Sequence, residues 1–355
     1  MDLLKFVAVL GTFLSLALAN LGCQLSYYAH SAYHQAQLIK KRVPVSQALE
    51  SSRLTDEQKR KLRLIGDVKS FGEQELGLKK SSNYTSYIQL DEPYVTYIVQ
   101  AAHAFELKPY LWSFPFVGQV PYKGYFKKAL AQAEAAEFDR TKFDTYVRGV
   151  SAYSTLGWFE DSVLSSMLRY DDHDLAELIL HESLHTTLFI KGASDFNERL
   201  ATFMGHEGMK LYYLKKEGAN SITLQKALDD SYDQKLFSEF LTRETEALKK
   251  WYEEQKGQLS QTQKEVRLKE IKDRFQRELS PKLKTKNYSE FAERELNNAV
   301  LLAYQTYEYS LEDFQKAYEL HGRDFKKTLD YFKSLESSKA PAQTLKDFVS
   351  GSTVR

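Results

Sequence analysis

Residues 181–185 read H-E-S-L-H and place His181 and His185 four positions apart inside a stretch, 172–190, whose pattern predicts a helix. Residues four apart on a helix share one face and lie about 6 Å apart along its axis. Both imidazoles can therefore reach one ion, and zinc accepts imidazole nitrogen at about 2.0–2.1 Å. The pattern predicts a zinc site on this helix.

Glu182 lies next to His181 and is rotated from it by about 100° around the helix. Its carboxylate can contact water in the open position of the metal without being a ligand, which is typical of a general base in zinc hydrolases. In that chemistry Glu182 takes a proton from the attacking water and passes it to the leaving amine. The donor that stabilises the oxyanion is not fixed by the pattern, and the candidates are Tyr153, Arg148 and Tyr304.

Glu198 is the candidate third ligand, because a catalytic zinc ion usually takes three protein ligands and one water. It lies at the start of a second apolar, helix-like run, which Ser194 or Asp195 can cap after a short turn. Ala201 and Gly205 follow at spacings that put them on the same helix face as Glu198. These small residues allow the second helix to approach the first closely, with Glu198 pointing at the ion.

Alternatives stay open for each of these residues. An H-E-x-x-H pattern also arises by chance, in which case its histidines are partly buried helix residues that bind nothing. Glu198 is also placed to complete a capping box begun by Asp195, and that role competes with metal binding for one carboxylate. His206 and Glu207 follow closely, but on other faces of the helix.

The first 22 residues have the pattern of an export signal. An apolar run over residues 6–22 is short for a membrane-spanning helix and typical of a signal peptide. The run stops at Gly22 and Cys23, which predicts a lipoprotein signal peptide over residues 1–22 and lipidation of Cys23. Cleavage after Ala19 and an uncleaved anchor are the alternatives, and the basic residues 40–42 argue against the anchor. Each fate places the main domain outside the cytoplasmic membrane.

Charge and cysteine content exclude several classes of function. The 355 residues carry 49 basic and 48 acidic side chains, a formal net charge of +1, whereas proteins that bind nucleic acid usually have a clear basic surplus. Cys23 is the only cysteine, so the chain can form neither an internal disulfide nor a cysteine-based zinc cluster. Any metal must be bound by histidine and carboxylate ligands.

Segments rich in Tyr, Thr, Val and Ile predict a small β-sheet upstream of the motif. Residues 84–90 and 94–99 read as two strands joined by a short turn, and residues 146–150 as a further strand. After the motif the apolar spacing is helical, with a heavily charged helical hairpin over about residues 233–283. We therefore predict one mostly helical α+β domain over residues 23–355.

Seven groups of short segments, taken together, indicate a family resemblance. They are GC at 22–23 with LSYYA at 25–29, FPFVG at 114–118, YKGYF at 122–126, YVRGVSAYSTLGW at 146–158, HESLH at 181–185, FNERLATF at 196–203 and LNNA at 296–299. Over nearly the whole chain they resemble the predicted aminopeptidase family of bacterial zinc-dependent lipoproteins. The resemblance implies a gluzincin-like zinc peptidase fold, zinc ligands at His181, His185 and Glu198, and catalysis by Glu182. The chain lacks a G-A-M-E-N-type segment, which binds the substrate's free amine in better-studied aminopeptidases.

Two functions from different classes fit these patterns. The first is a zinc metallopeptidase, an aminopeptidase by resemblance, which cuts peptide bonds and is tethered to the membrane by a lipid on Cys23. The second is a non-catalytic envelope lipoprotein that binds a partner through its charged helices and holds a structural or vestigial metal. Both place the chain in the cell envelope on the periplasmic side. Gln24 after the cysteine favours the outer membrane, by resemblance to bacterial lipoprotein sorting.

Overall fold

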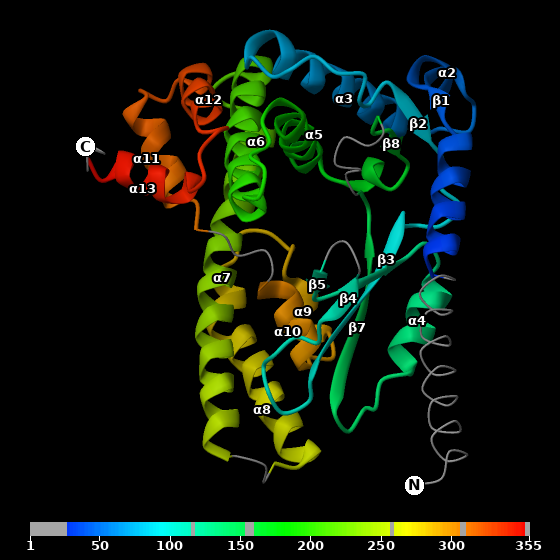
Figure 1. The fold of residues 1–355 in the computed structure, drawn as a ribbon, viewed down its shortest axis with the longest axis vertical. Coiled ribbons are helices and arrows are strands. Elements are labelled where there is room, and N and C mark those ends of the chain that lie inside the picture. The colour runs from blue at the N-terminus through cyan, green and yellow to red at the C-terminus, as the bar shows by residue number, and fades with distance from the viewer. Residues whose placement is uncertain (1–26, 115–117, 153–159, 256–258, 306–309, 352–355) are drawn as a thin grey trace, which may run out of the picture.

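The computed structural model describes residues 27–114, 118–152, 160–255, 259–305 and 310–351. These residues are mostly helical with small sheets, an α+β arrangement that confirms the predicted class (Figure 1). The predicted signal peptide, Cys23 and Tyr153 lie outside the described residues. None of the helices in the described ranges is long and apolar enough to cross a membrane.

The helices follow one another in chain order after a first helix over residues 27–40. The α-helices are α2 (Val45–Glu50), α3 (Asp56–Glu75), α4 (Lys128–Ala136), α5 (Asp172–Thr187), α6 (Ser194–Glu217), α7 (Ile222–Gln255), α8 (Gln261–Arg274), α9 (Ser289–Glu293), α10 (Asn298–Gln305), α11 (Glu312–Leu320), α12 (Phe325–Ser334) and α13 (Pro341–Val349). Short 3₁₀ or π turns are η1 (Met167–Arg169), η2 (Phe275–Leu279) and η3 (Ser280–Lys282).

The strands are short, with two exceptions. They are β1 (Val43–Pro44), β2 (Ser86–Ile88), β3 (Thr96–His103), β4 (Trp112–Phe114), β5 (Gly118–Val120), β6 (Lys123–Tyr125), β7 (Phe143–Val150) and β8 (Val163–Leu164). They form sheets in the orders β1-β2-β8, β6-β3-β7 and β4-β5.

The strands predicted over residues 84–90 and 94–99 are β2 and β3, and the two belong to different sheets. β2 lies between β1, to which it is antiparallel, and β8, to which it is parallel. β3 is instead the central strand of the second sheet and pairs with β7 from Thr96↔Val150 to His103↔Phe143. This long ladder satisfies more backbone groups of β3 than pairing with the three residues of β2 could.

The motif helix α5 is held between α3 and α6 in the upper part of the molecule as drawn in Figure 1. Leu175 and Ile179 of α5 are fully buried in the largest hydrophobic cluster. The start of α3 is fixed by a capping box, in which Gln58 N donates to Thr55 Oγ1 at 3.2 Å and Thr55 N donates to Gln58 Oε1 at 2.9 Å. α5 therefore has firm support on two sides.

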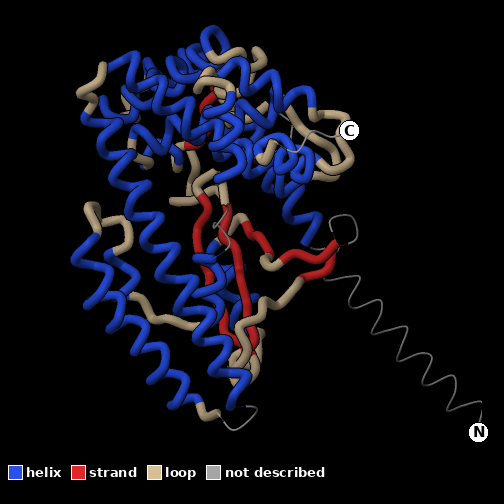
Figure 2. Tube along the Cα trace, turned by 90° about the vertical axis from the view of Figure 1, so that its left-hand side faces the viewer, coloured by secondary structure: helices blue, strands red, loops and turns tan. Residues whose placement is uncertain are grey.

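The long helix α7 connects these upper helices with the lower part of the molecule (Figures 1 and 2). There the apolar faces of α7 and α8 pack together in a second hydrophobic cluster, and α4 and α10 contact the sheet β6-β3-β7. A buried ion pair links these elements, because Lys264 Nζ of α8 lies 2.6 Å from Asp144 Oδ2 of β7. The same carboxylate oxygen accepts a hydrogen bond from Asn298 N at the start of α10, at 2.8 Å.

Candidate metal centre

The turn between α5 and α6 folds α6, which carries Glu198, back onto α5, which carries His181 and His185. Gly192 in this turn has a left-handed φ of +80°, and Asn197 of α6 fixes the turn from inside. Its Oδ1 accepts from Ile190 N at 3.0 Å, and its Nδ2 donates to Ile190 O at 2.8 Å. Because Asn197 is buried, this double hydrogen bond sets the position of the next residue, Glu198.

Small residues on α6 let it approach α5 at very short range. Ala201 is fully buried. A Cβ atom at Gly205 would lie 3.1 Å from Glu177 O and 3.2 Å from both the Cβ and the N atoms of His181. Such contacts are tighter than ordinary packing, and the neighbouring atoms are backbone atoms of α5 and the first side-chain carbon of His181, none of which can rotate away. The close approach of the two helices therefore requires glycine at this position.

The start of α6 differs from the sequence prediction. The N-cap residue is Ala193, which has no side-chain acceptor, and Ser194 is the first helical residue. Neither Ser194 nor Asp195 caps the helix, because Asn197 N already bonds to Ala193 O at 2.9 Å and begins the helix earlier. Glu198 then lies beyond the third helical residue and takes no part in a capping box.

Three donor groups converge where α5 and α6 pack. His181 Nε2 and His185 Nε2 lie 3.1 Å apart. The carboxylate oxygens of Glu198 lie 3.5 Å from His181 Nε2 and 3.4 Å from His185 Nε2. One ligand atom from each residue lies within 4.8 Å of the other two, and no further group of three His, Cys, Asp or Glu side chains meets this criterion in the described ranges. Two imidazoles and a carboxylate so placed can hold a metal ion.

These three side chains form one electrostatic unit. Hydrogen bonds from His181 and His185 hold the pKa of the Glu198 carboxyl well below its usual range. Burial by itself lowers the pKa of His185, but the hydrogen bond and charge of Glu198 outweigh burial, so the pKa is raised. Glu198 is therefore a carboxylate at neutral pH, which is the form that binds metal.

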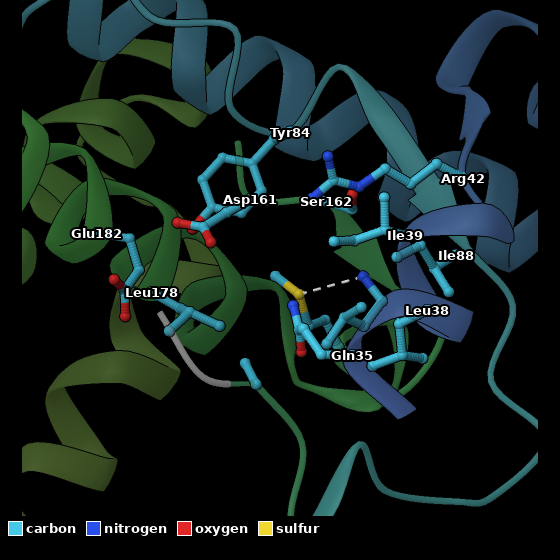
Figure 3. Close-up of a pocket in the computed structure, with 13 residues that line it drawn as sticks. Gln35, Leu38, Ile39, Arg42, Tyr84, Ile88, Asp161, Ser162, Leu178 and Glu182 are labelled. Carbon is cyan, nitrogen blue, oxygen red and sulfur yellow. Dashed lines mark hydrogen bonds between the residues drawn. The ribbon is translucent and has the colours of Figure 1, made fainter. Parts of the chain in front are cut away.

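Glu182 lies beside this unit with its Oε2 atom buried and without a hydrogen-bond partner. Burial raises the pKa of its carboxyl, while His181 and His185 oppose that rise. An unpartnered buried oxygen is destabilising, and such groups concentrate where chemistry uses them. Glu182 also lines a cavity on one side of α5 (Figure 3).

Arg148 and Tyr304, two of the three candidates for oxyanion stabilisation, lie on different elements of the lower part of the molecule. Arg148 is on β7, where its Nε donates to Gln100 Oε1 of β3 at 3.3 Å. Tyr304 packs in the second hydrophobic cluster, with its ring centroid 5.3 Å from that of Phe237. Tyr153 lies outside the described residues. Its role stays a prediction.

The other histidines near the motif pair with carboxylates. His206 Nδ1 of α6 lies 3.0 Å from Glu177 Oε2, one turn before His181 on α5. His173 Nε2 at the start of α5 lies 2.7 Å from Asp230 Oδ2 of α7. Glu207, which was considered with His206, pairs with Lys210 at 2.7 Å. The two histidine pairs connect α5 with α6 and with α7, and all three pairs lie outside the three-donor group.

Sequence reasoning missed Tyr84 and Asp161, which line the cavity together with Glu182. Tyr84 is buried and has a left-handed φ of +62°, which is rare for a bulky residue. Burial, followed by the charges of Glu182 and Asp161, raises the pKa of its hydroxyl well above the usual range. The sequence carries no signal for this arrangement, because nothing in the local pattern predicts a left-handed tyrosine.

Comparison with known proteins places the chain in a family. No curated protein and no solved structure matches the chain. The family model described as "Putative aminopeptidase" matches residues 26–346. This range contains α5, α6 and every residue of the three-donor group. Because the match covers most of the chain, the protein belongs to the putative aminopeptidase family.

Proposed function

We propose that the chain is a zinc metallopeptidase with a gluzincin-like fold, which hydrolyses peptide bonds and acts as an aminopeptidase. The observation that carries the proposal is the convergence of His181, His185 and Glu198 beside the buried carboxylate of Glu182. Family membership supports peptides as the substrate class. The charge balance of the chain does not favour nucleic acid as a partner.

The donor set fits zinc better than the common hard cations. Two imidazole nitrogens and one carboxylate oxygen are a ligand set of catalytic zinc sites, which keep a further position for water. Calcium and magnesium prefer oxygen ligands. His181, His185 and Glu198 would hold the ion, and zinc there would supply Lewis-acid activation of a water molecule and of the carbonyl to be cleaved.

Glu182 performs the proton transfers in this proposal. Its Oε2 accepts the proton of the attacking water and later delivers that proton to the nitrogen of the leaving amine. Water is thereby added across the amide bond, and Glu182 returns to its carboxylate form. The raised pKa of Glu182 suits both transfers, because a general base works best with a pKa near the working pH.

Glu182→Gln tests the mechanism, because glutamine keeps the size of the side chain and removes the proton acceptor. We expect the zinc content, measured by plasma mass spectrometry, to stay at the wild-type level. The kcat for peptide hydrolysis should fall by roughly 10²–10⁴-fold. His185→Ala should lose both metal and activity. Glu207→Gln is the matched control, because it changes a glutamate on α6 that pairs with Lys210, and it should keep both.

Two results would contradict the proposal in different ways. Wild-type turnover by Glu182→Gln would remove Glu182 as the base. Tight zinc binding by the wild-type chain, with no hydrolysis of any member of a mixed peptide library, would favour the alternative of a non-catalytic envelope protein with a structural or vestigial metal.

The proposal includes a lipid on Cys23 that tethers the protein to the periplasmic side of the cell envelope, at the outer membrane. Its support is the apolar run over residues 6–22, the Gly22-Cys23 pair and Gln24. Radiolabelled palmitate should label the wild-type chain and not Cys23→Ser. A mature wild-type chain that begins at Asn20 would instead support cleavage after Ala19.

A further inference from the structure

A cavity of about 40 Å³ lies beside Glu182, between α5 and the helix over residues 27–40. Much of its wall is apolar, formed by Leu38, Ile39, Ile88, Leu164, Met167 and Leu178. About 10–15 Å³ of such volume holds one water molecule, so the cavity admits a single side chain and excludes a folded segment. Its polar groups include Glu182, Asp161, Tyr84 and Arg42.

The acidic and basic side chains of the cavity lie at opposite ends. Figure 3 shows Asp161 beside Tyr84 on the side where Glu182 lies, whereas Arg42 reaches in from the opposite wall. Part of the Arg42 guanidinium is engaged, because its Nη2 donates to the backbone oxygen of Glu160. The end of the cavity near Glu182 therefore carries both carboxylates of the lining, and the guanidinium lies at the other end.

Asp161 is held in place by its backbone. Asp161 N donates to Asn83 Oδ1 at 3.1 Å, and Asp161 O accepts from Tyr84 N at 2.7 Å. Its two partners, Asn83 and Tyr84, belong to one turn of a different segment, in which Tyr84 has a left-handed backbone, a strained conformation of the kind that persists where the surrounding structure enforces it and that clusters at functional sites. The turn thus fixes the point from which the Asp161 carboxylate extends toward Glu182.

We propose that this cavity is the subsite for the N-terminal residue of a peptide, in which Asp161 pairs with the α-ammonium group and the apolar wall receives an aliphatic side chain. The inference rests on the proposed function, since Glu182 borders the cavity. In an amino-terminal residue, one carbon separates the ammonium group from the carbonyl that is cleaved. A group that binds the ammonium must therefore lie beside the general base, as Asp161 does. Asp161 would supply the amine recognition that the missing G-A-M-E-N-type segment supplies elsewhere.

Binding to zinc-loaded Glu182→Gln protein tests the subsite without turnover. Isothermal titration calorimetry should compare L-leucinamide with N-acetyl-L-leucinamide, which lacks the cation, and with glycinamide, which lacks the side chain. Leucinamide should bind at least about tenfold tighter than either. A hydrogen bond between two charged groups and a buried leucine side chain are each worth roughly that factor or more.

Three substitutions, each added singly to the Glu182→Gln protein, test which residue causes the preference for a free amine. Asp161→Asn should abolish the preference for the free amine and keep the preference for leucine over glycine. Asp161→Glu retains the carboxylate and should keep both preferences. Glu160→Gln is the matched control, because it neutralises the adjacent, exposed carboxylate, and it should also keep both. Circular dichroism establishes that each variant is folded.

Each contrary result overturns the assignment. Equal binding of leucinamide and its N-acetyl form, or an amine preference that survives Asp161→Asn, would remove Asp161 as the ammonium partner. Tighter binding of N-acetyl-L-leucine, an anion without an amine, would assign the cavity to Arg42. The readout is binding, so absence of turnover by the wild-type enzyme would refute the proposed function while calorimetry still decides this inference.

Discussion

Gly205→Ala should weaken metal binding by forcing α6 away from α5. The added Cβ atom would lie 3.1 Å from Glu177 O and 3.2 Å from His181 N and Cβ. These atoms belong to the backbone and the first side-chain carbon of α5, so they cannot rotate out of the way. The helices must separate by a few tenths of an ångström, and Glu198 on α6 then moves relative to its partners on α5.

The magnitude follows from two opposing effects on the free energy of unfolding. Alanine is more favourable than glycine in a helix interior by about 1 kcal/mol. An extra methyl group in a tightly packed contact is destabilising by about 1–3 kcal/mol. Gly205→Ala should therefore range from no net change to a loss of about 2 kcal/mol. Zinc affinity should fall by roughly tenfold, the lower end of what is seen when the support of a metal ligand is lost.

Gly66→Ala is the matched control. Gly66 is also a helical glycine, in α3, but a Cβ atom there meets nothing within 4 Å. Only the gain in helix propensity remains, so this variant should be more stable than wild type by about 0.5–1 kcal/mol. Its zinc affinity should be unchanged.

Urea unfolding of the metal-free proteins and competition with a fluorescent zinc chelator measure the two quantities. If Gly205→Ala gains as much stability as Gly66→Ala and keeps its zinc affinity, the close approach of α5 and α6 does not position the ligands. The geometric account of the site would then be wrong.

Three further outcomes are expected. Lys264→Ala should lower the free energy of unfolding, measured in urea, by about 3–5 kcal/mol. The substitution leaves the Asp144 carboxylate without its charged partner in a largely buried place. A loss below about 1 kcal/mol would contradict this expectation. Hydrogen bonds from Arg60 lower the pKa of Asp172 in the folded protein. The stability that these bonds give the folded state is therefore complete above the pKa of Asp172 in the unfolded chain, about 3.9. It is lost as the pH falls through the lower pKa of Asp172 in the folded state. The stability difference between wild type and Asp172→Asn should hold from pH 7 to about pH 5 and shrink below that, and a difference unchanged at pH 2 would refute the assignment. Removal of zinc by a chelator should lower the Tm of wild type, because an ion that binds only the folded state stabilises it, and should leave the Tm of His185→Ala unchanged.

Helical spacing predicted that His181 and His185 lie together at the candidate metal centre. His181 and His185 share a face because four residues make slightly more than one turn. The role of Asn197 was not predictable, because its partner Ile190 lies in an irregular turn that no periodicity describes. The predicted caps at Ser194 and Asp195 were wrong for the same reason. The turn, held by Asn197, starts the helix at a residue without a polar side chain.

Strand pairing was less predictable than strand position. The alternating and β-branched residues of β2 and β3 identify strands, because that signal is local. Their partners depend on segments far along the chain, such as β8 for β2 and β7 for β3. A short turn between two strands favours a hairpin, yet the much longer ladder available to β3 outweighed that local preference.

The metal centre and the cavity use neighbouring faces of one helix. His181 and His185 are four residues apart on α5, and so are Leu178 and Glu182, which line the cavity; each pair therefore shares a face. A substrate carbonyl placed at His181 and His185 therefore lies beside Leu178 and Glu182, and beside Asp161, which lines the same cavity. A change that displaces the α5 backbone should then alter zinc affinity and amine preference together. Asp161→Asn leaves that backbone in place and should alter amine preference alone.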